Sequence, residues 1–210
     1  MIGLRLPDGP LEILCLGAHP DDIEIGCGGT LLTLGSRPGL RATFAVLTGS
    51  PERHTEAQAA ARAFVPGAAT RLHGLPDGRL PAHWDEVKEA LEVLARDIRP
   101  DVVFCPRRDD AHQDHRLVAE LTPTVWRDAL VLEYEIPKWD GDLGRPSWYV
   151  GLDEETARRK VTLLDRCFPS QAGRDWWRED TFLGLMRLRG MECRAEAAEA
   201  FVVSKALLEL

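Results

Sequence analysis

The sequence has no uncharged apolar run that approaches the roughly 20 residues a transmembrane helix needs. It also lacks the start of a signal peptide, because the apolar run after Pro10 contains Glu12, has no basic flank and leads directly into polar residues. An excess of positive charge is missing too, since the net charge is −8 and the pI is about 5.3. Such a chain is a poor partner for nucleic acid. We therefore expect a cytoplasmic protein without a membrane span.

Cysteine pairs with metal-finger or disulfide spacing are also absent. The chain has five cysteines, an odd number, and no CxxC pair among them. This pattern predicts reduced, mostly buried thiols. The cysteines are Cys15, Cys27, Cys105, Cys167 and Cys193. Hydrophobic residues make up 44% and charged residues 29% of the 210 residues, an ordinary globular balance, so we expect a single domain over residues 1–210.

What the sequence does have is an alternation of strand-like and helix-like segments. The predicted strands are 11–16, 41–47, 69–72, 102–105 and 130–136, with a further candidate at 200–210. The predicted helices are 26–36, 51–64, 84–98, 117–127, 153–167 and 175–189. This rhythm predicts an α/β, Rossmann-like fold with a mainly parallel sheet and helices on both faces. Gly28 and Gly29 should let the first helix approach the sheet closely.

Two polar clusters follow predicted strands. The first comes after strand 11–16, where Pro20 ends the strand, and it contains His19, Asp21, Asp22 and Glu24. So many acidic and imidazole groups within six residues are unfavourable unless a cation lies among them, which predicts a divalent metal ion.

The second cluster, residues 107–116, follows strand 102–105 and contains His112, Asp114 and His115. Ligands of a doubly wound sheet bind beyond the carboxyl ends of its strands. We therefore expect the two clusters to face one crevice. Asp110 in the same cluster is a candidate to support a metal-bound histidine, although a loop aspartate without a role is an equal alternative.

His19 and Asp22 are three residues apart in a turn, so both can point at one ion. A histidine of the second cluster would complete a set of two histidines and one carboxylate. Three protein ligands leave a position for water, as in catalytic zinc sites, and the same set also serves Fe(II). Bound zinc lowers the pKa of its water towards about 7. Asp21 then remains as the general base, and a second imidazole can stabilise the oxyanion.

These motifs, residues 18–22 with the glycine-rich 26–30 and then 112–115, resemble the LmbE/PIG-L family of metal-dependent N-deacetylases. The resemblance extends from the first strand to at least the helix after the second motif. It implies that the metal ligands are His19, Asp22 and His115, with Zn²⁺ as the cofactor and Fe²⁺ as the alternative. It further implies that Asp21 is the general base, that His112 is an imidazolium for the oxyanion or the amine, and that Asp114 holds the His112 ring.

The resemblance implies a hydrolase that removes the N-acetyl group from an N-acetylglucosamine-type amino sugar, or its conjugate, by attack of a metal-bound water. Arg53 and Glu56 match an Arg-x-x-Glu pair of the family whose arginine contacts substrate. Asp77, in an Asp-Gly turn after a strand, is a second candidate for substrate binding, with a plain turn role as the alternative. One departure from the family pattern is Ile23, which separates the paired aspartates from Glu24.

Other interpretations compete with this one. The first cluster can be an Asx-rich turn that caps a helix. The glycines 26–29 can be the phosphate cradle of a nucleotide-binding domain, but they do not spell G-x-G-x-x-G and two aspartates would repel a pyrophosphate. A thiol-sugar conjugate amidase and a non-catalytic metal- or sugar-binding relative are the alternatives within the family, the latter disfavoured by the presence of Asp21. The expected partner is a small amino sugar; a homo-oligomer stays open. The tryptophans of the C-terminal third can stack on a sugar ring or pack internally: Trp139, Trp148, Trp176 and Trp177.

Overall fold

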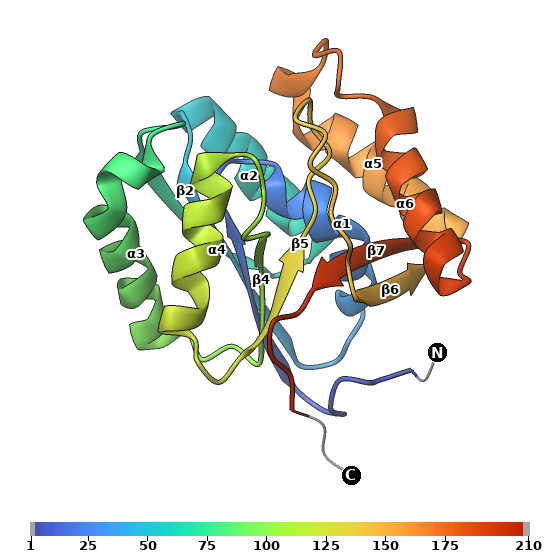
Figure 1. Cartoon of the computed structure of the whole chain (residues 1–210), viewed down its shortest axis with the longest axis horizontal. Coiled ribbons are helices and arrows are strands. Elements are labelled where there is room, and N and C mark those ends of the chain that lie inside the picture. The colour runs from blue at the N-terminus through green and yellow to red at the C-terminus, as the bar shows by residue number, and fades with distance from the viewer. Residues whose placement is uncertain (1–2, 208–210) are drawn as a thin grey trace.

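Seven strands form one sheet in residues 3–207, which the computed structural model describes (Figure 1). Their order across the sheet is β3-β2-β1-β4-β5-β7-β6. The strands are β1 (Leu11–Gly17), β2 (Leu40–Thr48), β3 (Ala69–Leu75), β4 (Val102–Pro106), β5 (Leu130–Tyr134), β6 (Trp148–Leu152) and β7 (Ala197–Val202). The first five strands are parallel to one another, whereas β7 runs antiparallel to both of its neighbours, β5 and β6. The predicted mainly parallel sheet is therefore confirmed.

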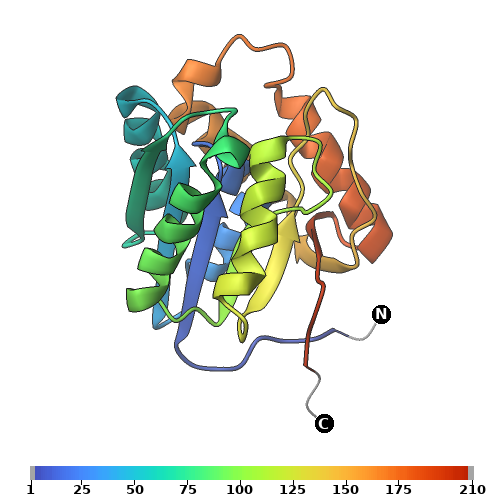
Figure 2. The same ribbon diagram turned by 60° about the vertical axis from the view of Figure 1, so that its left-hand side comes forward.

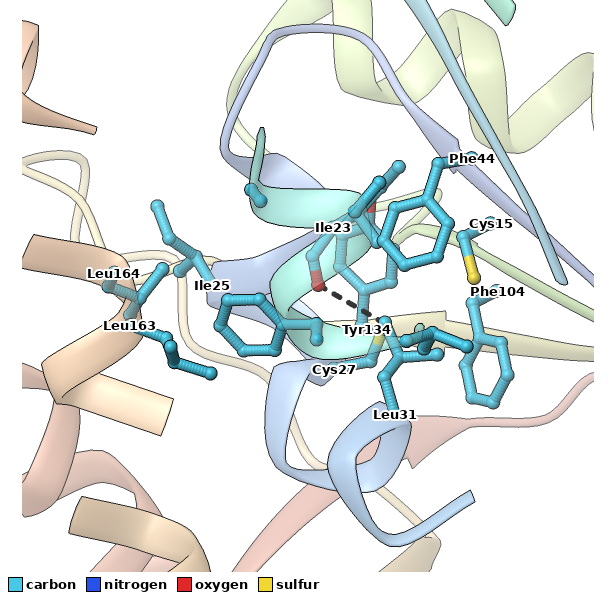
Figure 3. Packing of buried hydrophobic residues seen from close by; sticks show 14 of the residues in the cluster. Cys15, Ile23, Ile25, Cys27, Leu31, Phe44, Phe104, Tyr134, Leu163 and Leu164 are labelled. Carbon is cyan, nitrogen blue, oxygen red and sulfur yellow. Dashed lines mark hydrogen bonds between the residues drawn. The ribbon is translucent and has the colours of Figure 1, made fainter. Parts of the chain in front are cut away.

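Helices cover both faces of the sheet, as expected (Figures 1 and 2). One face carries α1 (Asp22–Leu34), α2 (Pro51–Phe64), α5 (Glu154–Cys167) and α6 (Glu179–Cys193); the other carries α3 (Trp84–Asp97) and α4 (Gln113–Val125). Two short 3-10 turns, η1 (Leu80–His83) and η2 (Pro169–Gln171), complete the elements. Each face has its own apolar core. The core beneath α1, α2, α5 and α6 includes Phe44, Phe104 and Leu164 (Figure 3). The core beneath α3 and α4 includes Leu91 and Val103.

The strand order reverses between β1 and β4, because β2 and β3 lie on one side of β1 and β4 lies on the other. β1 and β4 pair in parallel, with Ile13 opposite Val102 and Cys15 opposite Phe104. Both strands therefore deliver their following loops to the same edge, and an order reversal of this kind leaves a crevice there. The two polar clusters follow these two strands, so the fold itself brings them together.

The first helix packs tightly on the sheet through its glycines. A Cβ atom at Gly26 would lie 2.1 Å from the ring of Tyr134, and one at Gly29 would lie 2.5 Å from Leu152. Tyr134 is fully buried among the residues that Figure 3 draws. Its hydroxyl donates to the carbonyl of Leu16 at 2.7 Å. Close approach to the sheet was expected at Gly28 and Gly29; it is confirmed at Gly29, whereas a Cβ atom at Gly28 would lie 2.6 Å from the ring of Phe64 on α2. The five cysteines are free and four of them are buried, as predicted.

Several boundaries differ from the predicted ones. α1 begins at Asp22 and α4 at Gln113, four residues before the predicted starts, because the polar clusters themselves form the first turns. α6 covers 179–193 rather than 175–189, and strand β6 at 148–152 was not predicted. The last strand covers 197–202, whereas 200–210 was expected; residues 208–210 of that segment lie outside the described residues. None of the helices in the described residues combines the length and the apolar character needed to cross a membrane.

Candidate active site

The turn between β1 and α1 presents the first cluster. Asp21 has φ 110°, a left-handed value that a residue other than glycine rarely adopts. Asp22 begins the helix, and its Oδ2 accepts from the backbone N–H of His19 at 2.8 Å. Both aspartates are buried, with 7% and 3% of their surface exposed. The strained turn thus places two adjacent carboxylates against the sheet edge instead of letting them point into solvent.

Three side chains from the two clusters lie close together, with the two imidazoles facing different oxygens of Asp22. His19 Nδ1 lies 3.1 Å from His115 Nε2, His115 Nε2 lies 3.3 Å from Asp22 Oδ1, and His19 Nδ1 lies 3.5 Å from Asp22 Oδ2. Ligand bonds of about 2.0–2.2 Å in tetrahedral geometry separate neighbouring ligand atoms by about 3.3–3.5 Å. The predicted ligands therefore have the chemistry of a divalent metal site and lie close together, and their role as ligands stays a prediction.

The outer nitrogens of both imidazoles face carboxylates. His115 Nδ1 lies 3.1 Å from Asp110 Oδ2, although the angle is too poor for a directed hydrogen bond. His19 Nε2 lies 3.0 Å from Asp77 Oδ1 and 3.3 Å from Asp114 Oδ2. Metal-binding histidines usually have such a partner, which fixes the ring and makes the inner nitrogen a better ligand.

The electrostatics of the cluster favour positive charge between the ligands. Burial would lower the pKa of His19, but Asp22 and Asp114 raise it to about 12. Burial acts in the same direction on His115, yet Asp22 and Asp110 raise its pKa to about 9. Burial would raise the pKa of Asp22, but the two imidazoles hold it well below its usual range. A metal ion would supply the positive charge that protons otherwise provide.

Asp21, next to Asp22 in the chain, has a different environment. Its Oδ2 accepts from Nη2 of Arg53 at 2.6 Å. Burial raises the pKa of Asp21 to about 7, and Arg53 opposes that rise. A carboxylate with a pKa near neutrality suits proton transfer at physiological pH.

His112 lies against both other imidazoles, with ring centroids 4.6 Å from His19 and 4.7 Å from His115. It caps α4, because its Nδ1 accepts from the backbone N–H of Asp114 at 3.2 Å. Burial, with the nearby imidazoles, lowers the pKa of His112. A ring nitrogen of each of the three histidines lies within 4.8 Å of the others, so His112 is also close enough to reach the same ion.

The Asp114 carboxylate forms its hydrogen bonds with groups other than the His112 ring, so its implied role in holding that ring stays a prediction. The Asp114 side chain is completely buried and accepts from the backbone N–H groups of Gly78 at 2.8 Å and of Leu80 at 3.0 Å, besides facing His19. The reason is the early start of α4, which turns Asp114 towards the loop after β3. The His112 ring accepts from the backbone at the start of its own helix.

Comparison with known proteins places this site in a family. Residues 14–126 match the family model for PIG-L, described as GlcNAc-PI de-N-acetylase. The chain belongs to the PIG-L family. The uncharacterized deacetylase YaiS of Escherichia coli strain K12 is 32% identical over 138 residues, which cover 60% of this chain and 74% of YaiS.

Solved structures agree with the PIG-L assignment at the level of the fold. The conserved protein TT1542 from Thermus thermophilus is 24% identical with a TM-score of 0.73, over 95% of this chain and 97% of that one. The N,N'-diacetylchitobiose deacetylase from Pyrococcus horikoshii is 21% identical with a TM-score of 0.73, over 91% and 83%. The expected LmbE-like fold is confirmed, and the chain is a deacetylase of the PIG-L family.

Arg53 and Asp77, the two residues of this PIG-L deacetylase that the sequence predicts to bind substrate, lie beside the site. Arg53 contacts Pro20 and Asp21, and its Nη1 also donates to Glu56 at 2.7 Å and Ser170 at 2.8 Å. Asp77 lies at the rim, with 74% of its side chain exposed. Contact of either residue with substrate stays a prediction.

Sequence reasoning missed Lys138, whose Nζ lies 2.8 Å from Asp110 Oδ2 and so adjoins the carboxylate behind His115. It follows β5, the strand next to β4, and thus reaches the same sheet edge. Its position after a predicted strand was the only available signal.

Proposed function

We propose that the chain is a zinc-dependent hydrolase that removes the N-acetyl group from an N-acetylglucosamine-type amino sugar or its conjugate. The metal ligands in this proposal are His19, Asp22 and His115. The observation that supports it is the approach of the two imidazoles to each other at 3.1 Å and to the two Asp22 oxygens at 3.3 and 3.5 Å, with a separate buried carboxylate, Asp21, next in the chain. A structural site would have no use for that fourth, strained residue. The names of fold relatives support a sugar-conjugate substrate, since they include deacetylases of N,N'-diacetylchitobiose and of the A40926 pseudoaglycone.

The bound ion would supply Lewis acidity for the amide carbonyl and for water. Asp21 accepts a proton from the attacking water, and Arg53 at 2.6 Å keeps its carboxylate oriented. His112 accepts from a backbone N–H through Nδ1, so its neutral form carries the hydrogen on Nε2. That N–H is available to the oxygen on which negative charge develops. Asp21, once protonated, is then the acid available to the leaving amine.

The test combines metal exchange with a substrate panel. The protein is stripped with a chelator and reloaded with Zn²⁺ or, without oxygen, with Fe²⁺, and bound metal is counted. The panel contains free, nucleotide-linked and lipid-linked N-acetylglucosamine, N,N'-diacetylchitobiose and an acetylated thiol-sugar conjugate, scored for released acetate and free amine. We expect release from at least one sugar by the loaded protein only. Equal release by stripped protein, or none by any loaded form, would reject the proposal.

A further inference from the structure

Lys138 brings a mostly buried ammonium group to the candidate active site. It lies in the connection between β5 and β6 (Figure 1), and only 12% of its side chain is exposed. Its Nζ lies 2.8 Å from Asp110 Oδ2 and 2.7 Å from Asp142 Oδ2, and it donates to the carbonyl of Ile136 at 3.3 Å. An ammonium carries three hydrogens, so these three acceptors use all of its donors. They also define where the ammonium lies.

Asp110 links this ammonium to a predicted metal ligand. The Asp110 side chain is 1% exposed, and its Oδ1 accepts from the backbone N–H of His112 at 2.8 Å. Its Oδ2 faces both Lys138 Nζ, at 2.8 Å, and His115 Nδ1, at 3.1 Å. Among residues 3–207, Lys138 is the only Lys or Arg that forms an ion pair with this carboxylate. The ammonium and the backbone N–H therefore fix the carboxylate at both of its oxygens, with one oxygen turned to the His115 ring.

The loop of residues 137–147 has attachments that do not involve the ammonium. The backbone N–H of Gly144 donates to Glu135 Oε1 at 3.3 Å, and the Gly144 carbonyl accepts from Nη2 of Arg189 at 3.2 Å. The buried Arg107 donates to the carbonyl of Asp142. Removal of the ammonium alone should therefore leave the loop in place, so such a variant tests the charged group rather than the fold of the segment.

The positive charge of Lys138 is balanced by a neighbour. An unbalanced ammonium so close to the site would repel a divalent cation as well as orient the carboxylate. Asp142 Oδ2 lies 2.7 Å from the Nζ, and it also accepts from the backbone N–H of Ala111 at 2.7 Å. Because the two opposite charges are adjacent, a metal ion would experience little net repulsion from them. The orienting contact with Asp110 is the effect that remains.

We propose that Lys138 is a positioning residue of the metal site, which acts through Asp110 on His115. This inference rests on the proposed function, because it takes His115 as a metal ligand from there. The ammonium would hold Asp110 Oδ2 against the outer nitrogen of the His115 ring. The inner nitrogen would thereby keep facing Asp22, as it does at 3.3 Å. Partners of metal-binding histidines contribute about 10–100-fold to metal affinity, so a group one contact further out should contribute at the lower end of that range.

The test measures the Zn²⁺ affinity of the folded protein by competition with a chromogenic chelator. We expect Lys138→Met to bind Zn²⁺ about tenfold more weakly than the parent. Lys138→Arg should recover most of that loss, because it restores a cation beside Asp110. Lys88→Met is the matched control, since Lys88 pairs with Glu92 along α3 and does not contact the site. Its affinity should equal that of the parent.

A double variant separates action through Asp110 from a general effect on the fold. If the ammonium acts only through that carboxylate, Lys138→Met should weaken Zn²⁺ binding no further in a protein that already carries Asp110→Asn. The two losses would then be non-additive, which independent structural damage would not produce. Additive losses overturn the inference, as does parental affinity of Lys138→Met or a Lys138→Arg variant that binds no better than Lys138→Met.

The same samples separate this inference from the proposed function, because each is also scored for acetate release from the substrate panel. If no sugar is deacetylated but the loss in Lys138→Met and its recovery in Lys138→Arg appear, the proposed function fails and the positioning role stands. If the parent releases acetate while Lys138→Met keeps the parental affinity, the proposed function stands and the positioning role fails. A parent that binds no Zn²⁺ overturns both.

Discussion

Two buried charged clusters adjoin α1, and they follow different rules. In one of them, Lys160 and Glu199, which we call the matched cluster, the Nζ of Lys160 lies 2.6 Å from Glu199 Oε1 and donates to the carbonyl of Ile25 at 2.6 Å. Glu199 also accepts from the backbone N–H groups of Gly29 at 2.7 Å and Thr30 at 2.6 Å. α1 is broken between these residues, where Cys27 has φ −140° and ψ 17°. The pair therefore satisfies the backbone groups that the break leaves free.

The other is the candidate active site, which we call the unmatched cluster, because its carboxylates outnumber the Lys and Arg side chains that pair with them. Asp21, Asp22 and Glu24 gather on one turn, yet Arg53 is the only Lys or Arg side chain of the described residues that forms an ion pair with any of them. Burial raises the pKa of Glu24 to about 8, with Asp21 and Asp22 adding to the effect. The matched cluster is complete as it stands, whereas the unmatched cluster takes most of its positive charge from protons on His19 and His115 rather than from Lys or Arg. The comparison teaches that an unmatched buried cluster, rather than burial of charge as such, marks the place for a cation.

The largest effect is expected from removing a ligand of the unmatched cluster. His115→Ala leaves Asp22 and His19 without their third partner, so the variant should lose both bound metal and turnover. Metal per chain is measured by mass spectrometry after dialysis. His83→Ala is the control, since His83 is not part of the site and pairs with Glu86 on the surface. Full metal occupancy in His115→Ala would assign the third ligand to His112 instead.

Next in size is the loss of the general base. Asp21→Asn keeps the shape of the side chain but cannot accept the proton, so turnover should fall on the order of 10²–10⁴-fold while the metal stays bound. Because burial raises the pKa of Asp21 to about 7, the base is protonated below that pH. The kcat/KM of the parent should therefore fall as the pH drops through about 7 and level off above it. Near-parental turnover by Asp21→Asn would remove this residue from the mechanism.

The matched cluster should respond in stability rather than in metal binding. Lys160→Met leaves the Glu199 carboxylate buried and unpaired, which should lower the free energy of unfolding by about 3–5 kcal/mol. Chemical denaturation gives this value, and metal content per folded chain should stay at the parental level. Arg158→Ala on the same helix removes an exposed ion pair with Glu154 and should change stability little. Parental stability of Lys160→Met would show that the two clusters do not differ as argued.

The same contrast explains how far the sequence could predict the molecule. Strands and helices from 11 to 134 follow local apolar patterns, and each polar cluster directly follows a strand. The meeting of His19 with His115 was therefore predictable from the general rule for strand ends in parallel sheets. Strand β6 was not predicted and β7 was expected at 200–210, and their antiparallel pairing, with Trp148 opposite Phe201, has no signal in the local apolar pattern.

The matched cluster was beyond sequence reasoning for the same reason. Lys160 and Glu199 meet a break in α1 that lies more than 130 residues earlier, and neither occurs in a motif. The hydrogen bonds of Asp114 to the backbone of Gly78 and Leu80 were not predicted, because they depend on where α4 begins, and helix boundaries are the least reliable part of a sequence-based prediction. Residue type and the ends of strands predicted which groups gather; the details of loops decided which atoms touch.

The smallest effect should come from the residues behind the ligands. Burial alone would raise the pKa of Asp110, but His115 and Lys138 lower it to about 2, so it remains a carboxylate behind the His115 ring. Asp110→Asn keeps the volume and removes the charge, which should weaken metal binding about 10–100-fold without abolishing it. Competition with a chromogenic chelator measures the affinity. Asp109→Asn is the matched control, because the neighbouring Asp109 side chain is 75% exposed and does not contact His115. If the two variants bind the metal with equal affinity, Asp110 does not contribute to metal binding. A loss of affinity in Asp110→Asn alone would show that Asp110 is part of the unmatched cluster, together with Lys138 in the loop of residues 137–147.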